Sequence, residues 1–405
     1  MRNMLNGIVG SLCVFQLLLS VAVFAQTPAP LSSPGTAAVV NGVIEIDGVK
    51  FFPFGFFHVS QGGTAAQLWN DLNLTADAGF NIIHSRYEPG VTDATYGAFL
   101  DQAAQRGVRV ISEPAELLTT QITNFKSKTA ILAWNIADDV DDGTKTHALI
   151  QTRYNEVKST DPRHLAFVSG FRAPNEPGPG GVTSVTFMDV TNLLGMQRYP
   201  INNGGPIRIV WQANASTVDA ARPRGLPVIA NLQSFNWNDS HGNRFPTPAE
   251  GRNMTYQAIA AGVKGIIYYT FFDGGNYVPT GSPSLWAELK ALVPEVKTLA
   301  PVLLNGEMTP ALADVSGDRF ATYWTYQGRL YVVVMNTSTT SAKSFSLPMP
   351  AGTSGPAQPL FSGRPSGMTF TNGVLGGTVQ PLDVHVYVLN GSMPLPAPVT
   401  NLQLS

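Results

Sequence analysis

The chain has 405 residues, of which 44% are hydrophobic and only 13% are charged, and its formal net charge is −2. This length exceeds that of one ordinary domain and suits a large domain with a smaller companion. The balanced charge excludes the strongly basic surface on which nucleic-acid binding depends.

The first 25 residues have the pattern of a secretory signal peptide. Arg2 supplies the positive charge, an apolar stretch follows, and Ala25 precedes the expected cleavage site. The alternative is a membrane anchor, but polar residues and glycines interrupt the apolar stretch. We therefore expect a secreted protein, extracellular or periplasmic, with no stable membrane anchor once residues 1–25 are removed.

The mature chain lacks thiols. Cys13 is the only cysteine and lies within the signal segment, which excludes disulfides, thiolate catalysis and zinc–thiolate sites. Residues 26–37 are rich in Pro, Ser and Ala and are expected to form a linker.

The next part of the chain alternates between strand-like and helix-like segments. A short hairpin with a turn at Asp47-Gly48 comes first. Eight apolar segments then each become polar or aromatic toward their ends: 51–59, 81–88, 108–114, 130–139, 164–170, 193–200, 227–235 and 265–273. Amphipathic helices separate them, except that residues 173–181 form a loop between the fifth and sixth.

This alternation predicts an α/β fold, a closed (β/α)8 TIM barrel over residues 38–302. The alternative, an open doubly wound sheet, usually has a Gly-rich phosphate loop after its first strand, and the residues that follow this first segment do not match that pattern.

The apolar period changes to two after residue 303. A hairpin is expected over 319–338, with its turn at Gln327-Gly328, and further turns at Asn372-Gly373 and Gly376-Gly377. We expect a small antiparallel β-sandwich domain over residues 303–391, followed by a tail over 392–405.

Candidate site residues follow from the barrel itself, because such barrels build their sites at the carboxyl ends of the strands. The catalytic candidates at these ends are Asp138, Asp139, Glu113 and Asp273. The substrate-binding candidates are His58, His84, Arg86, Tyr199, Gln233, Trp237 and Tyr269. Cleaving a glycosidic bond needs one protonated and one ionised carboxyl, and adjacent like charges such as Asp138 and Asp139 raise at least one pKa.

The sequence contains no histidine spacing typical of a metal site, no phosphate loop and no nucleophile elbow. We therefore expect neither a metal nor a cofactor, with weak calcium binding by the Asp-rich residues 138–142 as the alternative. The two aspartates have an alternative interpretation as caps of the next helix, although Asp141 and Asp142 are nearer to it.

Four segments resemble the clan-A-like (β/α)8-barrel glycoside hydrolases and their uncharacterised secreted relatives. ILAWNIADDVDD (131–142) resembles their Trp-x-x-Ala-Asp-Glu-Pro segment at strand four, and residues 256–274 are similar to their strand-eight region. Residues 161–170 and 193–201 match in pattern, and the resemblance covers about 38–390. It implies a barrel with a C-terminal β-sandwich and a carbohydrate substrate. It places the acid/base Glu of the family on Asp139 and the preceding Asp on Asp138.

The chain departs from the family pattern at several positions. The acid is Asp and is followed by Val140, the strand-seven nucleophile position falls on Gln233, and a strand-six Asp position falls on Gln197. A neutral amide cannot serve as a nucleophile. The second carboxylate then comes from Glu113, Glu88 or Asp273, or the enzyme is inverting, or the barrel binds glycans without cutting them.

The leading hypothesis is a secreted glycosidase that cleaves O-glycosidic bonds of a poly- or oligosaccharide by carboxylate acid/base catalysis. Asp139 is the expected general acid, Asp138 supports it, and Glu113 or Asp273 is the partner. The alternative is a non-catalytic carbohydrate-binding protein on a glycosidase-like barrel.

Overall fold

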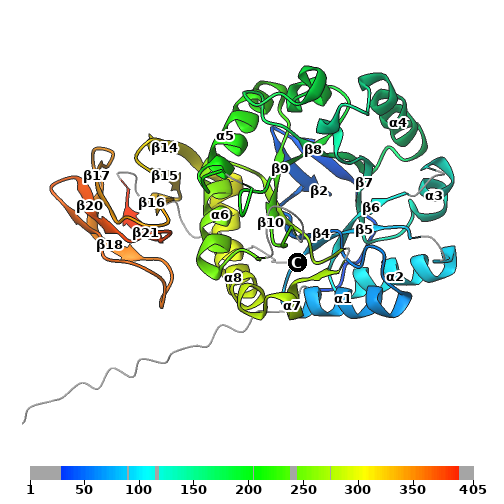
Figure 1. Cartoon of the computed structure of the whole chain (residues 1–405), viewed down its shortest axis with the longest axis horizontal. Coiled ribbons are helices and arrows are strands. Elements are labelled where there is room, and N and C mark those ends of the chain that lie inside the picture. The colour runs from blue at the N-terminus through cyan, green and yellow to red at the C-terminus, as the bar shows by residue number, and fades with distance from the viewer. Residues whose placement is uncertain are drawn as a thin grey trace, which may run out of the picture.

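The structure is a computed structural model that describes residues 29–88, 91–114, 118–203, 205–237, 244–273 and 275–391. The signal peptide expected at 1–25, the first residues of the expected linker and the tail at 392–405 lie outside this part of the chain. Figure 1 shows a ring of helices around a central ring of strands, with a second body of strands beside it.

Eight parallel strands form a closed barrel, in which the eighth strand pairs with the first. In chain order these strands are β4 (Phe54–Phe57), β5 (Ile82–Arg86), β6 (Arg109–Glu113), β7 (Ile131–Ala137), β8 (Leu165–Phe171), β9 (Leu193–Arg198), β10 (Val228–Gln233) and β11 (Gly265–Tyr269). Each lies within one of the eight apolar segments, or extends one residue beyond it, so the predicted (β/α)8 fold is confirmed.

Several helices of the outer ring begin after a threonine whose hydroxyl accepts a backbone N–H of the first turn. They are α1 (Ala65–Asp77), α2 (Asp93–Gln105), α4 (His147–Thr160) and α6 (Pro248–Ala261). The ring also contains α3 (Leu118–Phe125), α5 (Ile209–Ala221), α7 (Val278–Gly281) and α8 (Pro283–Asn305). Within the described residues, no helix has both the length and the apolar character that crossing a membrane requires.

Short 3-10 helices occupy several connections. Between β8 and β9, η2 (Pro179–Gly181) and η3 (Ser184–Phe187) replace an α-helix, as the loop predicted at 173–181 indicated. The others are η1 (Val140–Asp142) after β7 and η4 (Arg222–Arg224) after α5.

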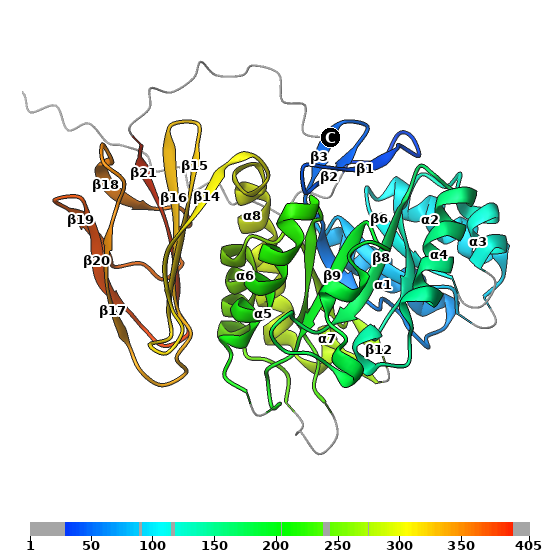
Figure 2. The same cartoon turned by 90° about the horizontal axis from the view of Figure 1, so that it is seen from above.

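A small antiparallel sheet covers the amino-terminal end of the barrel. It consists of β1 (Ala37–Val40), β2 (Val43–Ile46) and β3 (Val49–Phe51), with the predicted turn at Asp47-Gly48. Ala37 and Ile44 pack into the same buried cluster as barrel residues such as Ile82. Part of the expected linker also lies against the barrel, since Leu31 N donates to Ala104 O at 2.8 Å. Figure 2 shows this sheet at one end of the barrel and β12 (Phe272–Asp273) at the other.

The C-terminal region is an antiparallel β-sandwich. Its larger sheet has the order β14 (Glu307–Asp314), β15 (Arg319–Tyr326), β16 (Arg329–Asn336), β21 (Val384–Asn390) and β18 (Ser354–Pro359). The smaller sheet has the order β17 (Lys343–Pro348), β20 (Val374–Val379) and β19 (Thr369–Thr371).

The turn predicted at Gly376-Gly377 is wrong, because both glycines lie inside β20 and pair with β17. Gly377 permits a close approach there, since a Cβ on it would lie 3.0 Å from Met368 Cα. The turns expected at Gln327-Gly328 and Asn372-Gly373 are confirmed.

The larger sheet packs against the outer helices of the barrel, beside α5, α6 and α8 (Figure 2). The ring of Trp211 in α5 lies 4.8 Å from that of Phe320 in β15. Thr322 Oγ1 donates to Ala260 O at 3.2 Å. The sandwich therefore covers the side of the barrel and leaves the carboxyl ends of its strands uncovered.

Candidate active site

Five titratable side chains meet at the carboxyl ends of the barrel strands. His58 follows β4, His84 belongs to β5, Glu113 ends β6, Asp138 follows β7, and Asp273 lies in β12 beyond β11. The three carboxylate side chains are each about one-fifth exposed, at 21% for Asp138 and 20% for the other two. They are therefore partly desolvated but within reach of a ligand, as the strand-end rule predicts.

His58 lies between two of these carboxylates. Its Nδ1 is 2.9 Å from Asp273 Oδ2, and its Nε2 is 3.6 Å from Asp138 Oδ2. The hydroxyl of Tyr269 also donates to Asp273 Oδ2, at 2.6 Å. The groups after strands one, four and eight are thus linked through one imidazole ring.

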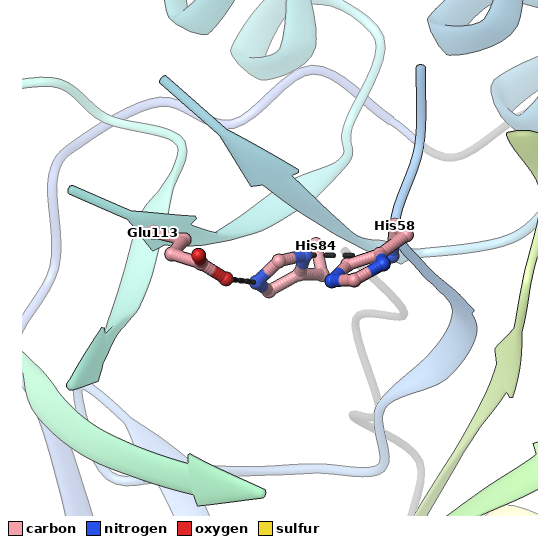
Figure 3. A group of neighbouring side chains, drawn as sticks. All are labelled: His58, His84 and Glu113. Carbon is pink, nitrogen blue, oxygen red and sulfur yellow. Dashed lines mark hydrogen bonds and ion pairs between the residues drawn. The ribbon is translucent and has the colours of Figure 1, made fainter. Parts of the chain in front are cut away.

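His84 and Glu113 form a second pair beside His58 (Figure 3). His84 Nε2 lies 3.1 Å from Glu113 Oε2, and Asn135 Nδ2 donates to the same oxygen at 2.9 Å. The backbone N–H of His58 donates to His84 Nδ1 at 3.4 Å. Nδ1 of His84 thus accepts from the backbone, and Nε2 faces both Glu113 and the amide Nδ2 of Asn135, which lies 3.1 Å away.

The surroundings separate the pKa values of the carboxyls. Burial raises the pKa of Glu113, but the hydrogen bond from His84 and the positive charges of His84, His58 and Arg86 outweigh it and lower the value to about 2. For Asp138, burial and the charge of Asp139 raise the pKa to about 6, against the opposing effects of His58 and Ser169.

Asp273 belongs with the ionised groups. Burial raises its pKa, but hydrogen bonds from His58 and Tyr269 more than compensate, so the net shift is downward. The site therefore combines one carboxyl that holds its proton up to about pH 6 with two that lose theirs at lower pH.

Two side chains that the sequence did not single out as partners hold Asp138. The hydroxyl of Ser169, at the end of β8, donates to Asp138 Oδ1, and Gln197 Nε2 in β9 donates to the same oxygen at 3.2 Å. Asn135 has a similar place beside Glu113. These three residues could have been found from the sequence as polar residues near strand ends that alternate with the apolar residues of the barrel wall and therefore face inward.

Asp139 has a different environment from its neighbour. It is exposed, has a left-handed backbone with φ 48°, and stands at the start of η1. Its backbone packs so closely on β8 that a Cβ on Gly170 would lie 2.4 Å from Asp139 Cα. The environment that we expected of a general acid, burial with a raised pKa, belongs to Asp138.

Two predicted substrate-binding residues hydrogen-bond to the loop after β9, and one of them, Trp237, stays partly exposed. Gln233 is buried, and its amide is hydrogen-bonded to the backbone N–H and C=O of Ile201. The indole Nε1 of Trp237 also donates to Ile201 O, at 2.7 Å. The expectation that Gln233 contacts a sugar is not met, because its polar atoms hold the loop after β9.

The other predicted binding residues surround the carboxylates. The rings of Tyr199 and Tyr269 are stacked with centroids 5.7 Å apart, and both side chains are partly exposed. Arg86 is 39% exposed, with Nε 3.6 Å from Glu113 Oε1. Aromatic faces and a guanidinium beside carboxylates provide stacking and hydrogen-bonding surfaces for a hydroxyl-rich ligand.

His58, His84 and Glu113 also form a group whose potential ligand atoms lie within 4.8 Å of one another. The hydrogen-bond directions do not fit a metal. Ligation through His84 Nε2 would move its proton to Nδ1, which faces the donating N–H of His58. These three residues fit an ion-pair and hydrogen-bond network better than a ligand set.

Comparison with known proteins gives structural matches only. No protein-family model matches the chain, and no curated protein is significantly similar to it in sequence. A glycoside hydrolase family 5 protein from Bacteroides vulgatus matches with a TM-score of 0.61 and 16% identity, over 91% of this chain and 95% of that one. The fold is shared with glycoside hydrolases.

Two further structures extend this similarity. A family 30 endoxylanase from Clostridium papyrosolvens has a TM-score of 0.52 and 14% identity, covering 90% of this chain and 99% of its own. An α-amylase from Geobacillus thermoleovorans, complexed with acarbose, has a TM-score of 0.56 and 14% identity, covering 84% and 99%. The predicted glycoside-hydrolase-type barrel with its C-terminal sandwich is thereby confirmed at the level of fold.

Proposed function

We propose that this protein is a secreted glycoside hydrolase that cleaves O-glycosidic bonds of a poly- or oligosaccharide, with Asp138 as the general acid. One observation supports this most strongly. At the open end of the barrel, a carboxyl whose pKa is raised to about 6 stands beside carboxyls whose pKa values are lowered. Pairs of carboxyls separated in this way are the acid and base of glycosidases.

The acid needs a proton that it can give to the leaving oxygen. Burial and the charge of Asp139 keep that proton on Asp138 up to about pH 6. An Asp with an ordinary pKa near 3.9 would be almost fully ionised there. A carboxyl that titrates close to the working pH is the more effective general acid.

Asp273 is the proposed base. The imidazole of His58 bridges it to Asp138 with contacts of 2.9 and 3.6 Å, which keeps the two carboxylates within about 9 Å. This bound includes both the ~6.5–9.5 Å of inverting glycosidases and the ~5–5.5 Å of retaining ones, so the choice between them rests on the strand-seven position. Since Gln233 provides no nucleophile at strand seven, we propose single-displacement hydrolysis with inversion.

The resemblance to the glycoside hydrolases points to Asp139 rather than Asp138 as the acid, and a pair of variants separates the two assignments. Replacing Asp138 with Asn is expected to lower kcat by about 10²–10⁴, the usual contribution of a general acid. The same change at exposed Asp139 is expected to lower kcat less than tenfold. The reverse order would restore Asp139 as the acid.

The substrate class rests on the surroundings of the carboxylates. Tyr199 and Tyr269 offer stacked aromatic surface, and Arg86 offers a cation beside Glu113. A structurally similar protein, named AmyP, was solved with maltose. For this chain a carbohydrate substrate is our inference from the site, and export is our inference from residues 1–25.

The test is a screen of the chain without residues 1–25 on a panel of polysaccharides and oligosaccharides. Products are identified by NMR, which also gives the anomer first released. Release of the inverted anomer supports Asp138 and Asp273, whereas retention would require a nucleophile such as Glu113. Glycan binding without any product over long incubation would instead support a carbohydrate-binding protein.

A further inference from the structure

The imidazole of His58 is held on every side by the protein. Its ring stacks on Phe57 with centroids 4.5 Å apart and meets Tyr269 edge-on at 5.1 Å. Each ring nitrogen faces a carboxylate, and the residue is only 7% exposed. A substrate above the barrel therefore finds no polar atom of His58 that is not already directed at a protein group.

We propose that His58 is a positioning residue that keeps Asp273 ionised and orients the protonated carboxyl of Asp138. This role replaces the substrate contact predicted from the sequence. It rests on the proposed function, because it assigns Asp138 and Asp273 as acid and base. His58 itself touches neither the sugar nor the reacting atoms.

The hydrogen bonds define which ring nitrogen carries the proton. Nδ1 is 2.9 Å from Asp273 Oδ2, an acceptor that already receives the hydroxyl of Tyr269. When the ring carries one proton, Nδ1–H donates to Asp273 and the lone pair of Nε2 faces Asp138 at 3.6 Å. An ionised Asp138 would face that lone pair acceptor to acceptor, whereas a protonated one avoids this repulsion and keeps its proton for the leaving oxygen.

Other titratable groups surround the ring. His84 lies 5.2 Å away between ring centroids, and its Nε2 faces Glu113. Arg86 and Glu113 form an ion pair of their own at 3.6 Å. The charge of Asp139 raises the pKa of the neighbouring Asp138.

The backbone fixes the position of the ring. His58 has a left-handed conformation with φ 45°, which is unusual outside glycine and is tolerated best by Asn, Asp and His. Its carbonyl accepts bonds from Thr270 Oγ1 at 3.0 Å and from Phe272 N at 3.2 Å. The loop that carries Asp273 is thus tied to the residue whose ring binds Asp273.

Two substitutions separate the two ends of the imidazole. In His58→Asn, the amide nitrogen takes a place close to Nδ1 and keeps a donor for Asp273, and Asn tolerates the left-handed backbone. In His58→Gln, the longer side chain places its amide close to Nε2, facing Asp138, and loses the bond to Asp273. Both variants remove the imidazole without adding charge.

The first measurement needs no substrate. In the wild-type protein, ¹⁵N NMR of labelled histidine is expected to show a proton on Nδ1 of His58. Titration of ¹³C-labelled aspartate is expected to show a higher pKa for Asp273 in His58→Gln than in wild type or His58→Asn. A proton on Nε2, or an Asp273 titration that is the same in all three proteins, would overturn the proposal.

The second measurement uses a substrate found in the glycan screen. Both variants are expected to lower kcat by about ten- to a hundredfold and to change KM by less than twofold. A raised KM with unchanged kcat would make His58 a substrate ligand and overturn the proposal. If no glycan is hydrolysed, the proposed function fails, and the NMR measurements still decide whether His58 controls the two carboxyls.

Discussion

Gln233 and Ile201 are joined by two hydrogen bonds between one side chain and one residue's backbone. Gln233 Oε1 accepts from Ile201 N at 2.8 Å, and Nε2 donates to Ile201 O at 3.2 Å. Nε2 also donates to Phe235 O at 3.3 Å. The end of strand seven, where the resemblance places a nucleophile, therefore clamps the loop that follows strand six.

Replacing Gln233 with Glu is expected to destabilise the protein without creating a nucleophile. A carboxylate loses both donor bonds and faces two carbonyl oxygens, so the free energy of unfolding at pH 7 should fall by about 1–3 kcal/mol. Urea unfolding measures this change. The matched control is Gln358→Glu, on an exposed strand position, which should change the free energy by less than about 0.5 kcal/mol. A gain in hydrolysis would show that a carboxylate at position 233 can act as a nucleophile, and would contradict a purely structural role for Gln233.

The pH dependence of turnover should follow the proton on Asp138. Because burial and Asp139 raise its pKa to about 6, the acid form is lost above that pH. kcat/KM is expected to fall about tenfold per pH unit above pH 6. Asp139→Asn removes the neighbouring charge, so it should lower the pKa of Asp138 and make kcat/KM begin to fall at a lower pH. An unchanged pH dependence of kcat/KM would mean that another group supplies the proton.

The same raised pKa carries a cost in stability. The folded protein holds the Asp138 proton more tightly than the unfolded chain, so stability falls as pH rises from about 4 to about 6 and then levels off. The total loss is about 3 kcal/mol at most. Asp138→Asn lacks this loss and should gain stability over wild type between pH 4 and pH 7. Denaturant unfolding at pH 4 and at pH 7 measures the stability of Asp138→Asn relative to wild type. The same relative stability at both pH values would contradict the prediction.

Much of the fold was predictable because the barrel depends on local patterns. The strands are buried on both faces and begin as continuous apolar runs, such as residues 131–134 in β7. The absence of an α-helix between β8 and β9 followed from the Gly- and Pro-rich loop at 173–181. The two glycines of β20 misled the turn prediction, because Gly377 serves a close approach to Met368 and the chain does not reverse there.

The sequence predicted which residues lie at the site, but it did not predict which aspartate takes the environment of the general acid. The strand-end rule selects His58, His84, Glu113 and Asp273, and the structure brings all of them together with Asp138. Which aspartate of the pair is buried depends on a bulge in β7 between Asn135 and Ala137. Regular alternation from inward-facing Asn135 would point Asp139 into the barrel, and the extra residue gives this place to Asp138. A sequence pattern does not carry that register shift.

Metal removal should leave the protein unchanged. A cation on His84 Nε2 would require the ring proton on Nδ1, which faces the donating backbone N–H of His58. Dialysis against a chelator is therefore expected to alter neither the thermal unfolding midpoint nor the rate on any substrate found. Elemental analysis of the purified protein provides an independent check. Loss of activity on dialysis, restored by one divalent cation, would make His58, His84 and Glu113 its ligands.

The junction between barrel and sandwich depends on buried Glu295 of α8. Its carboxylate accepts from Arg252 of α6 at 2.6–2.7 Å and from Arg364 of the sandwich at 2.5 Å. Glu295→Gln removes the shared charge and leaves Glu288, 3.0 Å from Arg364 and 4.0 Å from Arg252, as the remaining carboxylate, so a loss of about 3 kcal/mol in unfolding free energy is expected. Arg364→Met removes only the cross-domain partner and should cost less, because Arg252 still neutralises Glu295. Denaturant unfolding followed by tryptophan fluorescence gives both values, and a larger effect from Arg364→Met would show that the bond across the domains, not the buried charge, dominates.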